Sequence, residues 1–317
     1  MKEAAMAKTS HNTFLPIVAG SALVVIASGY LGYLTVAAIH LPTAFDWVKR
    51  VPSVPVTQNL PRSAATFDLA PEVKPVVVPR VLVSNIPQEL ATMQDANERK
   101  QVFIRMVLPL VLEVNARVEQ DRAHLLTLRA RTEAGHTLGP REQDWLNRIM
   151  RAYEVTDLDW DVLLRRVDTV PPSLAIAQAA NESAWGTSRF AQEGNALFGQ
   201  WVWSDNGMIP QERGEDETHS VRRFATPLAS VMAYVRNLNT HPFYQRFREL
   251  RDEIREADEH RPGYLLAGTL DGYSTRRDAY VEELRQIIRV NHLQALNSAV
   301  FGTGNDRLAF NLPTPRD

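Results

Sequence analysis

An uninterrupted apolar run near the N-terminus, LPIVAGSALVVIASGYLGYLTVAAI at residues 15–39, constrains this chain more than any other feature. The run contains no Asp, Glu, Lys or Arg, and as a helix rising about 1.5 Å per residue it would extend roughly 37 Å. The hydrocarbon core of a bilayer is about 30 Å thick, and the core of a signal peptide is shorter, with about 7–15 apolar residues. We therefore expect one transmembrane helix at 15–39, after a short N-terminal tail at 1–14. Cleavage near Ala37 is the alternative that these residues leave open.

Composition narrows the chemistry that the rest of the chain can perform. The 317 residues carry a formal net charge of -2 and include no cysteine. Phosphate binding needs a strong excess of Lys and Arg, so nucleic acid is not expected as a partner. The lack of cysteine excludes disulfides, thiolate catalysis and cysteine-ligated metal sites. The eight histidines show no metal-ligand spacing and no Gly-rich phosphate loop occurs, so we expect neither a metal site nor a cofactor.

A proline-rich segment follows the apolar run. Six prolines fall within residues 51–80, where they disfavour helix interiors and central strands, so we expect an extended linker at 40–80. From 81 to 155, apolar residues recur at spacings of three and four, which predicts a helical neck. Pro109 is expected to kink or split the long helix of this neck. The tail at 303–317 is expected to be poorly ordered.

Residues 170–201, VPPSLAIAQAANESAWGTSRFAQEGNALFGQW, carry the clearest chemical signal. Pro171 and Pro172 suit a helix entry, and the alanine-rich LAIAQAANESAW after them favours helix, with Glu182 near its C-terminal end. An anion gains nothing at the C-terminal end of a helix, and neighbouring Ala, Trp and Phe side chains would desolvate the carboxyl and raise its pKa. A raised pKa suits a general acid that works near neutral pH. A solvated glutamate on a helix surface fits the same spacing.

The motifs in this segment come in a distinctive order: AQAA at 177–180, ESAWG at 182–186, then Ser188, Phe190-Ala191 and NALFG at 195–199. This order resembles the signature of the peptidoglycan N-acetylglucosaminidases of glycoside hydrolase family 73 type, and more closely that of the Bax-like proteins of the same mannosyl-glycoprotein endo-beta-N-acetylglucosaminidase-like superfamily. Ala184 stands where many members have glycine, a small-for-small change that puts little of the resemblance in doubt.

The resemblance covers roughly residues 160–295 and implies a mostly α fold. We expect a lysozyme-like α+β catalytic domain with a small β-hairpin at 156–302, preceded by the neck, the linker and the transmembrane helix. The resemblance also implies that Glu182 is the catalytic acid.

The same resemblance assigns further site residues. The segment GYSTRRDAYVEEL is similar to the family's Y-(A/S)-T-D motif, and Tyr273 in it matches the tyrosine that the family places in its cleft. Arg276 stands in place of the Asp of that motif, and Tyr280 falls one residue later than the pattern predicts. Trp201 and Trp203 alternate along a strand and would either stack on a sugar or pack against the core. The substrate-binding candidates are the polar and aromatic side chains of these motifs: Gln178, Trp185, Asn195, Phe198, Trp201 and Trp203.

Glycoside hydrolysis usually needs a second carboxylate, which acts as a nucleophile or as the base for a water molecule. The family carries it in a flexible hairpin after the N-x-x-FG motif, and Asn206-Gly207 is a strong signal for such a tight turn here. Glu212 and Glu217 are the candidates in the acidic cluster that follows, and other carboxylates lie between them. Catalysis assisted by the N-acetyl group of the substrate would need neither residue.

The resemblance implies a hydrolase that cleaves the β-1,4 bond on the reducing side of N-acetylglucosamine in peptidoglycan, and the apolar run at 15–39 adds the expectation of a membrane anchor. Its partners would be glycan strands and, through residues 15–39, the lipid bilayer. Such a substrate places the anchor in the inner (cytoplasmic) membrane, with the catalytic domain in the periplasm or cell exterior. A lytic transglycosylase and a catalytically silent wall-binding scaffold are the alternatives. The sequence does not determine the oligomeric state.

Overall fold

The computed structural model describes residues 75–202, 207–210, 220–256 and 262–302. No helix in this described part is both long enough and apolar enough to cross a membrane. Several predicted segments lie outside the described residues, and they stay predictions: the tail at 1–14, the transmembrane helix at 15–39, the linker as far as residue 74 and the tail at 303–317.

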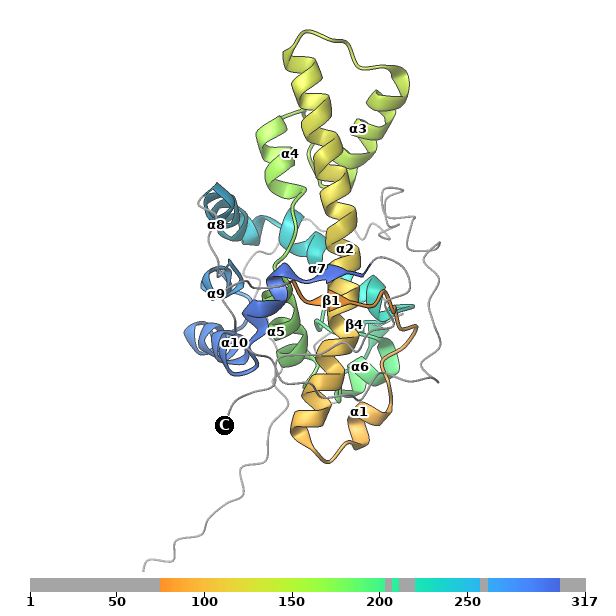
Figure 1. Cartoon of the computed structure of the whole chain (residues 1–317), viewed down its shortest axis with the longest axis vertical. Helices are drawn as coiled ribbons and strands as arrows, with labels where there is room; N and C mark the ends of the chain where they lie inside the picture. The colour runs from red at the N-terminus through yellow and green to blue at the C-terminus, as the bar shows by residue number, and fades with distance from the viewer. Residues whose placement is uncertain (1–74, 203–206, 211–219, 257–261, 303–317) are drawn as a thin grey trace, which may run out of the picture.

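The longest element is helix α2, Ala96–Glu133, which runs the length of the fold (Figure 1). It begins at Asp95, whose side chain accepts hydrogen bonds from the first backbone N–H groups of the helix, a standard N-cap. Pro109 lies inside α2, which continues without a break, so the predicted split is wrong. Proline removes one backbone hydrogen bond, and the surrounding side chains, which are buried from Val102 to Val111, compensate for that loss.

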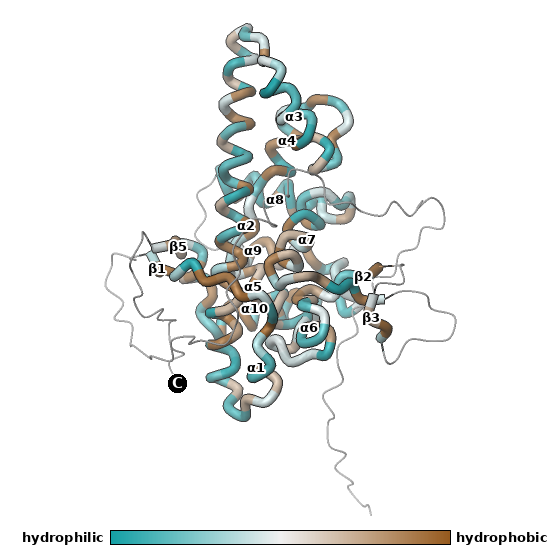
Figure 2. The backbone as a smooth tube through the Cα atoms, turned by 90° about the vertical axis from the view of Figure 1, so that its right-hand side faces the viewer, coloured by the Kyte–Doolittle hydropathy of each residue, from teal (hydrophilic) through white to brown (hydrophobic). Residues whose placement is uncertain are grey.

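Helix α5, Pro172–Glu182, lies at the centre of the fold. All of its residues from Pro172 to Ala180 are buried, and α5 packs against α2, α9 (Pro262–Ala267), α10 (Asp278–Val290) and the 3-10 helix Leu293–Ser298. Helix α7 (Pro227–Thr240) reaches α5 through the hydrogen bond from Tyr234 to Gln178. Alanine at four of these positions lets the neighbouring helices approach closely. In Figure 2 the apolar segments gather around α5, while the projecting end of α2 is largely hydrophilic.

The other helices pack around α2 and α5. Helices α3 and α4 lie beside the projecting half of α2, and one hydrophobic core spans the predicted neck and the predicted catalytic domain (Figure 1). The remaining elements have these bounds: α1 Glu89–Thr92, α3 Pro140–Ala152, α4 Trp160–Arg166, α6 Arg189–Gly194, the 3-10 helix Pro242–Tyr244, α8 Gln245–Glu256, and the parallel strands β1 Val77–Val78 and β5 Val300–Phe301.

A small sheet follows α6, as the mostly α class with some β structure predicts. Its strands are β2 (Trp201–Val202), β3 (Gly207–Met208) and β4 (Ser220–Arg222), in the order β2-β4-β3. The predicted simple hairpin is therefore wrong in its pairing, because β4 lies between the two strands that were expected to pair. Glycine at 207 permits this arrangement, since a Cβ there would lie 2.2 Å from the Cβ of Ser220.

Candidate active site

Glu182 is the last residue of α5, and its carboxyl group is the centre of the candidate site. The hydroxyl of Tyr280 donates a hydrogen bond of 2.8 Å to Glu182 Oε1. Burial raises the pKa of Glu182 to about 7, against the opposing effects of the Tyr280 hydrogen bond, the Asn181 amide and the charge of Arg276. Glu182 is only half-buried, so part of its surface stays open to an incoming ligand. The geometry provides an accessible carboxyl that is substantially protonated at neutral pH.

A chain of hydrogen bonds between Tyr234, Gln178 and Tyr280 lies behind Glu182. Gln178, one helical turn earlier on α5, donates through Nε2 to the hydroxyl of Tyr280 at 3.0 Å. Its Oε1 accepts from the hydroxyl of Tyr234 at 2.6 Å. Gln178 is completely buried, so the structure places it behind the carboxylate and not on a surface that a sugar could reach.

Two further aromatic rings stack on the tyrosines of this hydrogen-bond chain. Phe198 stacks on Tyr234 with ring centroids 3.9 Å apart, and Tyr273 stacks on Tyr280 at 5.5 Å. The hydroxyl of Tyr273 donates to the backbone oxygen of Phe198 at 3.3 Å. Burial raises the pKa values of Tyr234, Tyr273 and Tyr280 well above the usual value of tyrosine, so all three remain hydrogen-bond donors. Tyr273 thus lies in the wall of the site, one ring removed from Glu182.

The backbone just after Glu182 has an unusual conformation. Ala184, Trp185 and Gly186 have φ angles of +50°, +59° and +79°, three consecutive residues in the left-handed region. The buried Ser183 hydroxyl bridges this turn, because it donates to Ala179 O at 2.6 Å and accepts from Gly186 N at 2.9 Å. L-residues adopt this region at a cost of about 1–2 kcal/mol each, so alanine at 184 carries backbone strain that glycine would not.

Contacts with α2 hold this turn in place. The half-buried Trp185 ring meets Phe103 edge-on at 5.7 Å. A Cβ at Gly186 would come within 3.0 Å of Leu90 and 3.1 Å of Phe103, so glycine is required there by space as well as by φ. The Ser-Ala-Trp-Gly part of the motif therefore shapes the chain that follows Glu182.

Two other predicted substrate-binding residues lie in the interior. Asn195 is buried and ends α6 with φ +51°; its side chain accepts from Ile86 N at 3.1 Å and donates to Phe224 O at 3.2 Å. Phe198 is 2% exposed. The structure thus gives Asn195 and Phe198 contacts within the protein. Trp201 is half-buried beside a small apolar cluster of Ala196, Met208 and Val221.

Trp203, Glu212 and Glu217 lie outside the described residues, so their predicted roles stay predictions. Sequence reasoning assigned no site role to Tyr280 or to the pair formed by Arg276 and Glu283. The Arg276 guanidinium bonds both oxygens of Glu283, at 2.5 and 2.6 Å, and lies 5.8 Å from the centre of the Tyr280 ring. The i, i+4 spacing of Gln178 and Glu182 places both side chains on one helix face, and this is the signal that could have indicated a polar network there.

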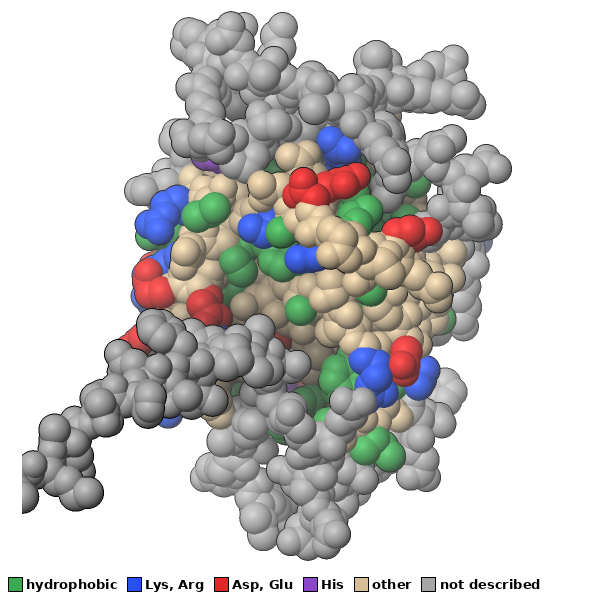
Figure 3. All heavy atoms as spheres, turned by 90° about the horizontal axis from the view of Figure 1, so that it is seen from below, with side chains coloured by type: hydrophobic (Ala, Val, Ile, Leu, Met, Phe, Trp, Pro, Cys, Tyr) green, Lys and Arg blue, Asp and Glu red, His purple; other side chains and the backbone are tan. Residues whose placement is uncertain are grey.

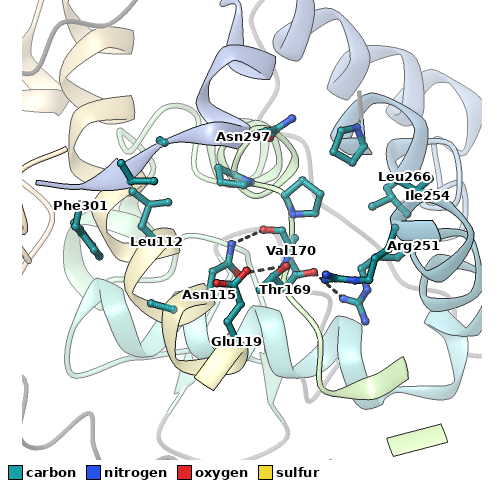
Figure 4. Close-up of a pocket in the computed structure, with 17 residues that line it drawn as sticks. Leu112, Asn115, Glu119, Thr169, Val170, Arg251, Ile254, Leu266, Asn297 and Phe301 are labelled. Carbon is teal, nitrogen blue, oxygen red and sulfur yellow. Dashed lines mark hydrogen bonds between the residues drawn. The ribbon is translucent and has the colours of Figure 1, made fainter. Parts of the chain in front are cut away.

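A separate cavity of about 640 Å³ lies at the opposite end of α5, around Pro171 and Pro172 (Figure 4). Two of its polar side chains are engaged with the protein: Asn115 bonds both the N–H and the C=O of Val170, and Arg251 donates to Thr169 O. None of the site residues predicted from the sequence lines this cavity.

On the face shown in Figure 3, acidic and basic side chains are interspersed and not gathered into a patch of one sign. Within the described ranges, no group of His, Asp and Glu is arranged to hold a metal ion.

Comparison with known proteins adds a family context to this geometry. Residues 162–293 match the Glucosaminidase family model, described as mannosyl-glycoprotein endo-beta-N-acetylglucosaminidase. The chain is also similar to Protein bax of Escherichia coli (strain K12), with 34% identity over 203 residues, which cover 62% of this chain and 71% of that protein. No solved structure gives a significant match. The matched range includes the whole network around Glu182.

Proposed function

Because this chain belongs to the Bax-like group of the mannosyl-glycoprotein endo-beta-N-acetylglucosaminidase superfamily, we propose that it hydrolyses peptidoglycan, with Glu182 as the general acid. The bond cleaved is the β-1,4 bond on the reducing side of N-acetylglucosamine. The observation that carries the proposal is the half-buried carboxyl at the end of α5, whose pKa burial raises to about 7 and which Tyr280 holds at 2.8 Å.

The proposed chemistry begins with proton transfer. Glu182 gives its proton to the glycosidic oxygen as the bond from that oxygen to the anomeric carbon breaks and positive charge develops on the sugar ring. A pKa near 7 keeps a large fraction of the acid protonated at neutral pH and still lets it release the proton. Glu212 or Glu217 would then act as the nucleophile or as the base that activates the attacking water. Alternatively, the N-acetyl group of the substrate attacks the anomeric carbon first, and water hydrolyses the intermediate that results.

The proposal includes a location. Residues 15–39 would anchor the chain in the inner membrane as a single span, and the proline-rich linker at 40–80 would hold the domain away from the bilayer. Since peptidoglycan lies outside that membrane, the domain would face the periplasm or cell exterior.

The full chain should release soluble fragments from purified sacculi, and mass spectrometry of reduced products should find N-acetylglucosamine at the new reducing ends. Glu182→Gln should lower the rate by at least about 100-fold, because the variant cannot donate the proton. Glu193→Gln, a change of an exposed glutamate of α6, is the matched control and should keep the rate.

Three results would contradict parts of this proposal. Full activity of Glu182→Gln would remove the assignment of the acid. Anhydro-muramic acid products would instead indicate a lytic transglycosylase. Binding to sacculi without any product would indicate a wall-binding scaffold.

A further inference from the structure

The hydrogen bonds behind Glu182 have a defined direction. Tyr234 can only donate to Gln178 Oε1 at 2.6 Å, so the amide nitrogen of Gln178 faces Tyr280 and donates to its oxygen at 3.0 Å. A phenol has one hydrogen, and the Tyr280 oxygen already accepts from Gln178. The Tyr280 hydrogen is therefore directed to Glu182 Oε1, at 2.8 Å.

We propose that this relay, Tyr234 to Gln178 to Tyr280 to Glu182, makes Tyr280 a positioning residue that selects which oxygen of Glu182 carries the catalytic proton. Oε1 is held as an acceptor, so the proton resides on Oε2. The inference rests on the proposed role of Glu182 as a general acid and adds to it the residues that orient the acid.

The surroundings of Oε2 suit this assignment. A Cβ placed on Gly199 would lie 3.9 Å from Oε2, so the neighbouring backbone carries no side chain over that oxygen. Gly199 also has φ +57°, a conformation that favours glycine. Oε2, the oxygen that holds the proton, therefore lies next to a backbone position without a side chain.

The relay also stabilises the product of proton transfer. When the proton leaves Oε2 for the glycosidic oxygen, the new carboxylate keeps the hydrogen bond from Tyr280, and hydrogen bonds to the charged form lower a pKa. Other groups near this carboxyl are Asn181 on α5, Arg276 and its partner Glu283, and the buried rings of Tyr273 and Tyr244. The Asn181 side chain also hydrogen-bonds this carboxyl and lowers its pKa, so removal of Tyr280 takes away one of two donors.

Two variants of the full chain test the relay through the pH dependence of fragment release from sacculi. Tyr280→Phe removes the donor, so the alkaline limb of the rate profile should move up by about one pH unit. Gln178→Met keeps a side chain of similar length but donates no hydrogen bond to the Tyr280 oxygen, so the Tyr280 hydrogen is no longer directed to Glu182. This variant should move the limb in the same direction by a smaller amount.

Tyr153→Phe is the matched control, because Tyr153 is an equally buried tyrosine at the end of α3. It should leave the limb in place. A ¹³C titration of the Glu182 carboxyl, assigned with Glu182→Gln, measures the same shift without any activity. A chain that titrates as expected but releases nothing from sacculi would refute the proposed function and support the relay. An unchanged Glu182 titration in both Tyr280→Phe and Gln178→Met would overturn the relay.

Discussion

The left-handed turn after Glu182 makes a quantitative prediction for the free energy of unfolding. Ala184 has φ +50° and an exposed side chain, so Ala184→Gly relieves backbone strain and removes no buried contact. Relief of the strain gains about 1–2 kcal/mol. The greater freedom of glycine in the unfolded chain opposes it by about 0.4–1 kcal/mol. We expect Ala184→Gly to stabilise the protein by about 0.5–1 kcal/mol.

Equilibrium unfolding in urea, followed by far-UV circular dichroism, measures this difference. The matched control is Ala123→Gly, which changes an exposed alanine in the middle of α2. There the same substitution should destabilise by about 1 kcal/mol, since glycine is a poor helix former. The two changes are chemically identical, and only the backbone conformation makes their effects opposite in sign. A destabilisation by Ala184→Gly equal to that of the control would refute the reasoning.

Three further predictions concern the same site. Glu182→Gln should stabilise the fold at pH 8 by up to about 3 kcal/mol in urea unfolding. Burial raises the pKa of Glu182 from 4.5 to about 7, so the folded state retains a proton that the unfolded chain loses between these values; stability therefore falls as pH rises, and the gain should vanish at pH 4. In a ¹³C titration of Glu182, Arg276→Gln should move the midpoint to higher pH and Glu283→Gln to lower pH, because the guanidinium lowers this pKa and the carboxylate raises it; shifts of the opposite sign would contradict the geometry. Asn195→Ala should cost about 2–3 kcal/mol in urea unfolding, since it leaves the buried Ile86 N–H without its acceptor; an unchanged stability would contradict this structural role.

The local features of the site followed from the sequence. The helix that begins at Pro172 depends on residues within a few turns of one another, and Glu182 lies at its C-terminal end as expected, although α5 stops before the predicted end at Trp185. The resemblance to glucosaminidases rests on the same contiguous motifs, and the family match over 162–293 confirms it.

The pairing of the small sheet was not predictable in this way. Asn206-Gly207 signals a turn between neighbouring strands, but β4 arrives from a later part of the chain and pairs with both β2 and β3. The polar motif residues Gln178 and Asn195 were taken for substrate contacts, since a sequence does not distinguish a polar side chain that faces a ligand from one that satisfies buried protein groups.

The sequence by itself therefore determined the helices, the carboxyl group at the end of one of them and the family. Tertiary structure alone decided which side chains surround that carboxyl. Tyr280 is 98 positions from Glu182, and the two meet only because α10 packs against α5. The pKa of Glu182 and the direction of its hydrogen bonds depend on burial and on donors from distant segments. Local propensity cannot specify them, because packing brings such groups within a few ångströms only after the chain has folded.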